Sequence, residues 1–371
     1  MFRSRIADLL TLLIEGLVAL LVLGSVWPFG SVQAFFQAIL LGGVALILVV
    51  WAIKTAILGR PLWKPCLLVT LAAAFCCVPM FQLQPLPRAW LQWIAPGTAD
   101  WLNEFRPPPA DLPGAERDSL TFDAGLTRVW LFRLIGFAAL FAAIRNNLTH
   151  PAAFMRFAWL CIANGALLAI VGIGQMTSSP ENVVFWSIPT DGSVFGPFIC
   201  RNHAAYVLNL CLGLAFGLLL GTRSFLLTGS ANKRRLNRPI WVEMLRDVPV
   251  AWILCAIGIL FAGLVATLSR GGLVSLLFAG GVGLTALGGR FGSRLRWVVA
   301  LPTIAVAVCF LGFSGFDRVT KRWDKLVDDS VAPESRVNVW ARTAPLIGRF
   351  PAWGSGWGTF ILVEPPTRKP G

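Results

Sequence analysis

The recurrence of long apolar segments is the feature that most constrains how this chain can fold. Runs of about eighteen or more mostly apolar residues recur along the sequence, and a helix of that length crosses the hydrocarbon core of a bilayer. Only 13% of the 371 residues are charged, against roughly 25% in soluble domains. We therefore predict an all-α fold, a polytopic bundle of transmembrane helices.

These segments predict about nine spans. They lie near residues 9–27, 33–53, 66–82, 126–144, 154–175, 202–222, 249–268, 271–288 and 297–314. The first run is long enough to span and lacks a small-residue cleavage site, so we interpret it as a membrane helix and not as a signal peptide.

The order of the spans divides the chain into three parts. Residues 1–190 hold the N-terminal helices with a Pro-rich external loop at 83–125, and residues 191–314 hold the core of the membrane domain. Residues 315–371 leave the last span on the outside without returning. We interpret this last part as the start of a large periplasmic loop that is incomplete here, with a complete external tail as the alternative.

The distribution of positive charge predicts the orientation. Sixteen of the 32 Lys and Arg residues fall in the connections assigned to the cytoplasm, whereas the loop 83–125 holds three against six acidic residues. Because cytoplasmic connections are rich in Lys and Arg, the N-terminus is expected inside. This places the segment 195–209, the turn 269–272 and everything after residue 315 on the external face.

Aromatic residues and net charge indicate contacts with lipid. Trp90, Trp93 and Trp101 near the start of the external loop indicate an interfacial anchor, with stacking on a glycan or lipid as the alternative. The net charge of +14 points to anionic headgroups and to topology, and not to nucleic acid.

Arg270 is a single cation between two apolar runs, in the sequence ATLSRGGLVSLLF. On insertion scales such a residue costs roughly 2.5–3.5 kcal/mol at a helix centre and by default marks a functional site or a partner. The alternative is a helix-end arginine that reaches the headgroups. Gly271 and Gly272 allow a tight reversal, and Ser269 precedes a helix whose first amides point outward. An arginine fork beside such amides suits a phosphate or diphosphate.

A second polar constellation is ESRVNVWARTAPLIGRFPAWGSGWGTF, residues 334–360. Ser335 is a plausible N-cap, and Arg336, Trp340 and Thr343 share one helical face because their spacings are four and three. Pro351 and the glycines that follow it predict a flexible turn. The alternative is an amphipathic helix on the membrane surface without a catalytic role.

A third constellation, FGPFICRNHAAYVLN, precedes the expected sixth span. Arg201, Asn202 and His203 gather polar groups at the start of this helix. Capping by Asn202 with a positive flank explains the pattern without chemistry. His203 is also a candidate general base, because an unperturbed histidine has a pKa near 6.5.

Two ionisable residues are expected deeper in the membrane, Glu15 in the first span and Arg133 in the fourth. They could pair across helices, or Arg133 could line a cavity for a lipid phosphate. We carry Arg133 forward as a candidate substrate-binding residue.

Motifs for other chemistries are missing. The sequence contains no Walker A motif, no dinucleotide fingerprint and no H-E-x-x-H. The eight cysteines lie mostly in apolar segments without a C-x-x-C pair, so they indicate neither a zinc site nor a disulfide framework. We expect no cofactor and no metal.

Three stretches resemble the O-antigen ligase and O-antigen polymerase superfamily of bacterial inner-membrane glycosyltransferases. GPFICRNHAAY looks like its G-x-F-x-N-R-N-H-x-A motif, and SRGGLVSL looks like its S-R-G-[GA] turn. SRVNVWARTAPLIGRFPAWGSGWGTF looks like its S-R-x-x-x-W block with P-x-x-G-x-G-x-G-x-F. The resemblance covers residues 195–360, and the first 190 residues match only in hydropathy.

The resemblance implies a GT-C-like, metal-independent transferase with a cavity open to the periplasm. An undecaprenyl-diphosphate-linked glycan would be the donor, and a lipid A core, another acceptor or a growing polysaccharide would be the acceptor. Arg270 and Arg336 would hold the diphosphate and stabilise the leaving group, with Ser269, Gly271, Arg201, Asn202, His203 and Trp340 lining the substrate. Cys200 replaces the first asparagine of its motif, and the later H-x-H-N-type histidine motif of the family is missing.

Two other classes remain open. A transporter or flippase for a lipid-linked sugar or anion would also bind a diphosphate, although the sequence shows no inverted repeat. The third possibility is a membrane scaffold without activity.

Overall fold

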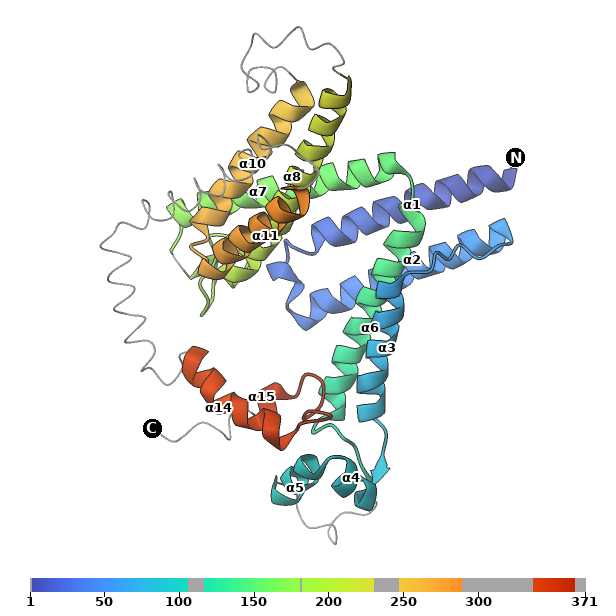
Figure 1. The fold of residues 1–371 in the computed structure, drawn as a ribbon, viewed down its shortest axis with the longest axis vertical. Helices are drawn as coiled ribbons and strands as arrows, with labels where there is room; N and C mark the ends of the chain where they lie inside the picture. Colours follow the sequence, from blue (N-terminus) through green and yellow to red (C-terminus); the bar gives the residue numbers. More distant parts are fainter. Residues whose placement is uncertain (1, 106–116, 181, 230–246, 289–335, 364–371) are drawn as a thin grey trace. The chain divides into compact units, whose positions relative to one another are not determined.

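The computed structural model describes residues 2–105, 117–180, 182–229, 247–288 and 336–363 (Figure 1). The chain divides into two compact units. Of the described residues, 2–7, 44–105, 117–146 and 336–363 form the first unit, and 8–43, 147–180, 182–229 and 247–288 form the second.

The described parts are mostly helical, and six helices are long and apolar enough to cross a membrane. These helices are α1 (Phe2–Gly24), α2 (Ala34–Leu58), α6 (Ala124–Asn147), α7 (Pro151–Ser178), α8 (Arg201–Gly229) and α10 (Val248–Ala266). They correspond to six of the expected spans, so the all-α, multi-pass membrane class is confirmed.

The number of nine spans is not confirmed. The expected spans at 66–82 and 271–288 are apolar helices, α3 (Leu67–Gln82) and α11 (Arg270–Gly288), but their described apolar stretches are shorter than a full span. The expected span at 297–314 lies outside the described residues.

The core of the second unit is the packing of α7, α8 and α10, which lie side by side (Figure 1). Small residues allow this close approach, as is common between membrane helices. A Cβ atom on Gly165 of α7 would lie 2.6 Å from the Cys211 sulfur of α8, and one on Gly263 of α10 would lie 2.5 Å from the Ala169 Cβ of α7. The glycines at these crossings therefore determine how closely the helices approach, whereas hydropathy determines only that they can span a membrane.

In the second unit, polar contacts connect α7 to α1 and to the residues that follow α1. The Trp27 indole N–H donates to the Asn164 side-chain oxygen at 3.0 Å. Glu15 forms an ion pair with Arg156 at 2.7 Å. The suggested pairing of Glu15 with Arg133 is therefore wrong, because Glu15 pairs with Arg156 on α7.

Short elements connect the helices of the second unit. The 3-10 helix η1 (Phe29–Ser31) follows α1. Between α7 and α8, strand β3 (Val183–Val184) pairs antiparallel with β4 (Ile188–Pro189), with Val183 opposite Pro189. Phe195 and Phe198 then form an isolated bridge just before α8.

In the first unit the segment 83–125, expected as a loop, contains regular structure. Strand β1 (Leu86–Pro87) pairs antiparallel with β2 (Arg117–Asp118), and between them lie α4 (Arg88–Ile94) and α5 (Pro96–Phe105). Four buried apolar residues hold this segment together: Leu91, Ala99, Leu102 and Leu120. The sequence did not predict this small core, because its few apolar residues are spread over a Pro-rich segment.

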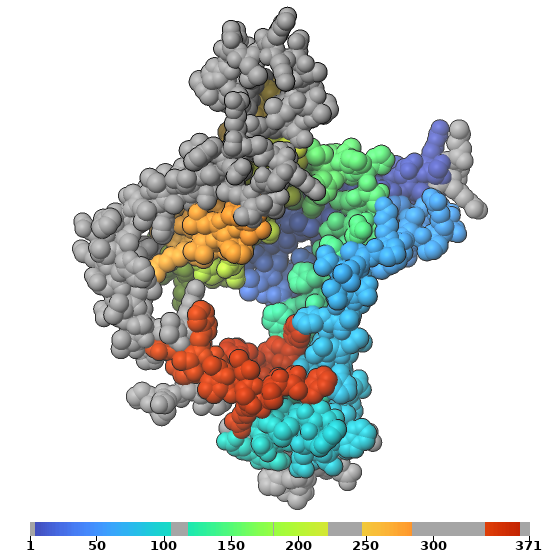
Figure 2. Space-filling view, viewed as in Figure 1, coloured from blue at the N-terminus to red at the C-terminus, as the bar shows by residue number. Residues whose placement is uncertain are grey.

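The C-terminal part of the first unit packs on this segment. Helix α14 (Arg336–Arg349) is followed by a glycine-rich turn and the short helix α15 (Phe360–Val363). The space-filling view shows α14 and the turn directly against α4 and α5 (Figure 2). Gly97, the second residue of α5, makes this contact possible, because a Cβ atom there would lie 2.0 Å from the Arg349 carbonyl oxygen.

Candidate functional site

The turn that contains Arg270 is held by its own serine. Leu268 has a positive φ of 52°, which reverses the chain after α10. Ser269 is buried, with 2% of its surface exposed, and its hydroxyl oxygen accepts the Gly272 N–H at 3.2 Å. This hydrogen bond is typical of an N-cap serine, whose hydroxyl oxygen accepts the backbone N–H of the residue three positions later. The cap begins α11 at Arg270, one residue before the expected start at 271.

Helix α8 holds the same turn from the side. The Ser269 hydroxyl donates to the Asn202 side-chain oxygen at 2.7 Å, and the Asn209 side-chain N–H donates to the Gly272 carbonyl at 2.8 Å. Gly272 has no room for a side chain, since a Cβ atom would lie 2.6 Å from the Ala205 Cβ. Two turns of α8 therefore determine where α11 begins. Sequence reasoning proposed Asn202 for this region but missed Asn209.

Arg270 itself is exposed at the first position of α11. Gly271 beside it is also exposed, and a Cβ atom there would lie 3.7 Å from the Tyr206 hydroxyl, an ordinary contact distance. The helix dipole places partial positive charge at this end of α11, next to a permanent cation. Arg270 therefore presents an exposed guanidinium group from a turn that side-chain hydrogen bonds hold in place.

The polar group at the start of α8 lies in the same unit. Arg201 is the first residue of α8 and is half-buried, and its backbone N–H donates to the Ser193 carbonyl at 2.8 Å. His203 is exposed. Of the predicted residues, the structure joins Asn202 to Ser269 directly, and places Arg201 and His203 beside Asn202 on the first turn of the same helix.

Aromatic rings anchor the loop that leads into α8. A Cβ atom on Gly172 would lie 2.2 Å from the Phe195 ring, and one on Gly30 would lie 2.8 Å from the Phe198 ring. Both phenylalanines are buried, and Gly196 between them has a positive φ of 58°. The G-P-F sequence thus brings the chain tightly over the helix bundle and sets the start of α8.

The second predicted arginine belongs to the first unit. Arg336 begins α14, but its side chain lies outside what the structure describes. Trp340 on the same helix is 67% exposed. Since Arg270 belongs to the second unit, the expected meeting of the two guanidinium groups stays a prediction.

The glycine-rich turn after α14 is held by α3 and α6. Gly354, Gly356 and Gly358 all have positive φ, at 67°, 114° and 82°. Gln82, at the end of α3, donates to the Trp353 carbonyl at 2.7 Å and accepts the Trp357 N–H at 3.0 Å. The three glycines are therefore used for the left-handed backbone that this double contact requires.

Helix α6 completes the support of the turn. The Thr127 hydroxyl donates to the Trp357 carbonyl at 3.0 Å. A Cβ atom on Gly358 would lie 2.0 Å from the Trp130 ring, and the guanidinium of Arg133 lies 4.6 Å from the centre of the same ring. Arg133 is thus next to the glycine-rich turn. Sequence reasoning missed Gln82 and Thr127, because a lone polar residue at a helix end gives no motif.

Trp101 does not serve as a free anchor. It stacks on Phe122 with ring centres 4.1 Å apart, and Phe122 contacts Phe350. Trp90 and Trp93, by contrast, are exposed on α4.

Together these features define the class of the protein: a multi-pass helical membrane protein with arginine-bearing helix starts supported by buried polar contacts. Residues 255–370 match the family model described as O-antigen ligase, and this match supports an O-antigen ligase or polymerase-like family. The matched region includes the Arg270 turn, α14 and the glycine-rich turn. No curated protein and no solved structure matches the chain.

Proposed function

We propose that the protein is a periplasm-facing glycosyltransferase of the O-antigen ligase or polymerase type, in the bacterial inner membrane with its N-terminus in the cytoplasm. It moves a glycan from an undecaprenyl-diphosphate carrier to a lipid A core, another acceptor or a growing polysaccharide chain. One observation supports this most: Arg270 is exposed on a turn that Ser269, Asn202 and Asn209 hold rigidly, within the region that matches the ligase family.

The reaction places a clear demand on this turn. The bond between the anomeric carbon and the diphosphate oxygen breaks, a bond to the acceptor hydroxyl oxygen forms, and the hydroxyl proton is released. The leaving diphosphate carries the developing negative charge. A guanidinium fork held in place stabilises that charge, because a preorganised donor needs no reorganisation during the reaction.

The other predicted residues have roles in the same proposal. Arg336 supplies a second cation for the diphosphate, and Trp340 offers an exposed aromatic surface to the substrate. His203, exposed one helical residue beyond Asn202, is the candidate that accepts the acceptor proton. Arg133 binds carrier phosphate from its position over Trp130.

Substitution of Arg270 tests the proposal. Arg270→Ala is expected to lower glycan transfer about 10²–10³-fold, as for the loss of one charge-stabilising donor. Arg270→Lys should also be impaired, because an ammonium ion cannot form the two parallel bonds of the fork. Arg336→Ala should behave like Arg270→Ala.

Transfer is measured with purified lipid-linked donor and acceptor in proteoliposomes. Arg60→Ala is the matched control, since Arg60 is exposed on a connection expected in the cytoplasm. Normal transfer by both arginine variants would refute the assigned roles. Movement of the donor across the membrane without a new glycosidic bond would instead establish a transporter or flippase.

A further inference from the structure

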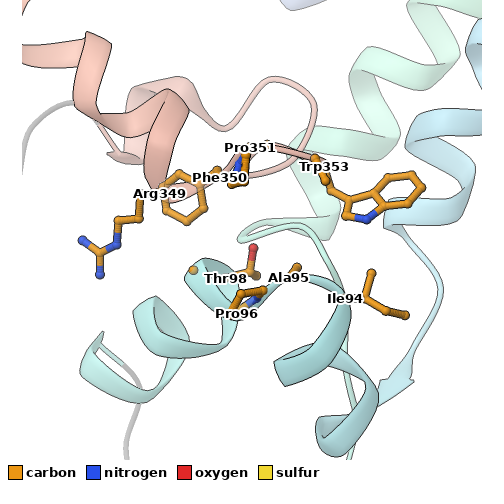
Figure 3. A pocket seen from close by; sticks show the side chains of 11 residues that line it. Ile94, Ala95, Pro96, Thr98, Arg349, Phe350, Pro351 and Trp353 are labelled. Atoms are coloured by element: carbon orange, nitrogen blue, oxygen red, sulfur yellow. The ribbon is translucent and has the colours of Figure 1, made fainter.

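A small pocket lies in the first unit between the start of α5 and the turn after α14 (Figure 3). Residues 94–98 form one wall and residues 349–354 the other. Its cavity volume is about 30 Å³, and about 10–15 Å³ on the same measure holds one water molecule. The pocket therefore admits a group of a few heavy atoms and not a whole sugar ring.

One wall carries a buried hydroxyl that has no partner in the described parts of the chain. Thr98 is 1% exposed, and no hydrogen-bond partner for its hydroxyl oxygen exists among the described residues. Figure 3 shows this oxygen directed toward the opposite wall, at residues 350–351. Buried hydroxyl groups are nearly always hydrogen-bonded, so an unpaired one that lines a pocket points to a polar group that enters from outside.

The charges around the pocket favour a neutral, dipolar group. The positive end of α5 begins at Pro96, and the carbonyl end of α14 lies against it, with the Arg349 carbonyl oxygen beside Gly97. The side chain of Arg349 is already compensated by Glu104 at 3.1 Å. A full charge would be repelled by one of the two helix ends, whereas an amide presents an acceptor to one and a donor to the other.

The remaining walls are apolar. Ile94, Pro96, Phe350 and Trp353 line the pocket, and Figure 3 shows the Trp353 indole at its side. A methyl group fits such a lining, and an aromatic face with its negative quadrupole attracts the C–H groups of a sugar ring at the rim.

We infer that this pocket binds the acetamido group of an N-acetylated sugar. The Thr98 hydroxyl donates to the amide oxygen, the carbonyl end of α14 accepts the amide N–H, and the methyl group lies among the apolar walls. The choice of a sugar over a peptide rests on the proposed function, which brings a glycan to this protein. The pocket would thus recognise one sugar of the donor or acceptor glycan by its acetamido group.

Binding is tested by saturation-transfer NMR on the full chain in nanodiscs with three probes: methyl 2-acetamido-2-deoxyglucoside, methyl glucoside, and N-acetylglycine methylamide as a peptide-bond mimic. The acetamido glycoside is expected to bind through its methyl group. Thr98→Val should weaken it about tenfold, the effect of one hydrogen bond. Ala95→Leu, which fills the pocket, should abolish it.

Thr190→Val is the matched control, because Thr190 belongs to the second unit and is not among the residues that line the pocket. Thr98→Val removes an unpaired hydroxyl and keeps the side-chain shape, so its melting temperature should equal or exceed that of the wild type. Equal binding of methyl glucoside, no binding of the acetamido glycoside, or unchanged binding by Thr98→Val would overturn the inference. Equal binding of the peptide mimic would overturn the choice of a sugar.

The two proposals fail separately. Arg270-dependent glycan transfer without acetamido binding would leave the proposed function in place and remove the pocket assignment. Acetamido binding by a protein that transfers no glycan would remove the proposed reaction and keep the sugar site.

Discussion

At the residue scale, the absence of a side chain at a few positions decides how the candidate site packs. Gly272 lies against Ala205 of α8, and Gly358 lies against the Trp130 ring of α6. Each glycine allows a backbone segment to approach a helix that carries a polar anchor, Asn209 or Thr127. The arginine turn and the glycine-rich turn are therefore supported in the same physical way, by close packing next to a directed hydrogen bond.

Substitution of Gly358 should be costly. Gly358→Ala places a methyl group 2.0 Å from the Trp130 ring at a φ of 82°, so strain and overpacking add up to about 1–3 kcal/mol or more. The melting temperature in detergent measures this loss. Gly348→Ala is the matched control, since a Cβ atom on this helical glycine meets no atom of the described residues within 4 Å. Equal melting temperatures for the two variants would contradict the described contact.

At the element scale, the separation of the membrane helices depends on small residues as well as on hydropathy. Helices α7, α8 and α10 approach at Gly165 and Gly263, and the buried leucines and isoleucines of the three helices surround these crossings. In lipid, apolar surface alone does not drive association, so close packing provides much of the stability.

Substitutions of two glycines on α7 distinguish the contribution of helix packing to stability from that of helix propensity. Gly165→Ala should destabilise the protein by about 1–3 kcal/mol, because its methyl group would lie 2.6 Å from the Cys211 sulfur and also crowd Leu260. The methyl group of Gly174→Ala on the same helix meets no atom of the described part of the chain within 4 Å, so this substitution should leave stability unchanged or slightly raised. Thermal unfolding in detergent compares the two, and a reversed order would disprove the described helix contact.

At the scale of the whole molecule, the proposed chemistry requires one orientation. The start of α8 and the Arg270 turn must face the periplasm, while the connection that holds Arg60 faces the cytoplasm. The hydrogen bond between Asn202 and Ser269 places the starts of α8 and α11 on the same side of the second unit. A measurement of which side of the membrane one of them faces therefore applies to both.

Cysteine labelling measures that side. In a chain whose eight native cysteines are replaced, a membrane-impermeant thiol reagent added to spheroplasts should label His203→Cys and not Arg60→Cys, because both parent residues are exposed but are expected on opposite faces. Labelling after lysis is the control for both positions. The opposite pattern would contradict the orientation and, with it, a periplasmic reaction.

Hydropathy and spacing predicted much of this protein. Six spans, and the starts of α8 and α11 to within one residue, followed from apolar run length, because this is a local property. The capping role expected of Asn202 was wrong, because Asn202 is the second residue of α8 and its side chain contacts Ser269. The two helices α4 and α5 were missed, and so was the role of Gln82. Their stability depends on contacts between segments far apart in the chain, which no local pattern records.

The sequence by itself thus determined that this protein crosses a membrane and where its polar helix starts fall. Only the tertiary structure decided that Asn209 holds the arginine turn, that Arg156 is the partner of Glu15, and that Thr98 lines a pocket with a hydroxyl that finds no partner among the described residues. The physical reason is distance along the chain: membrane partitioning acts on each segment alone, whereas a hydrogen bond between residues 63 or 141 positions apart forms only when packing brings them together.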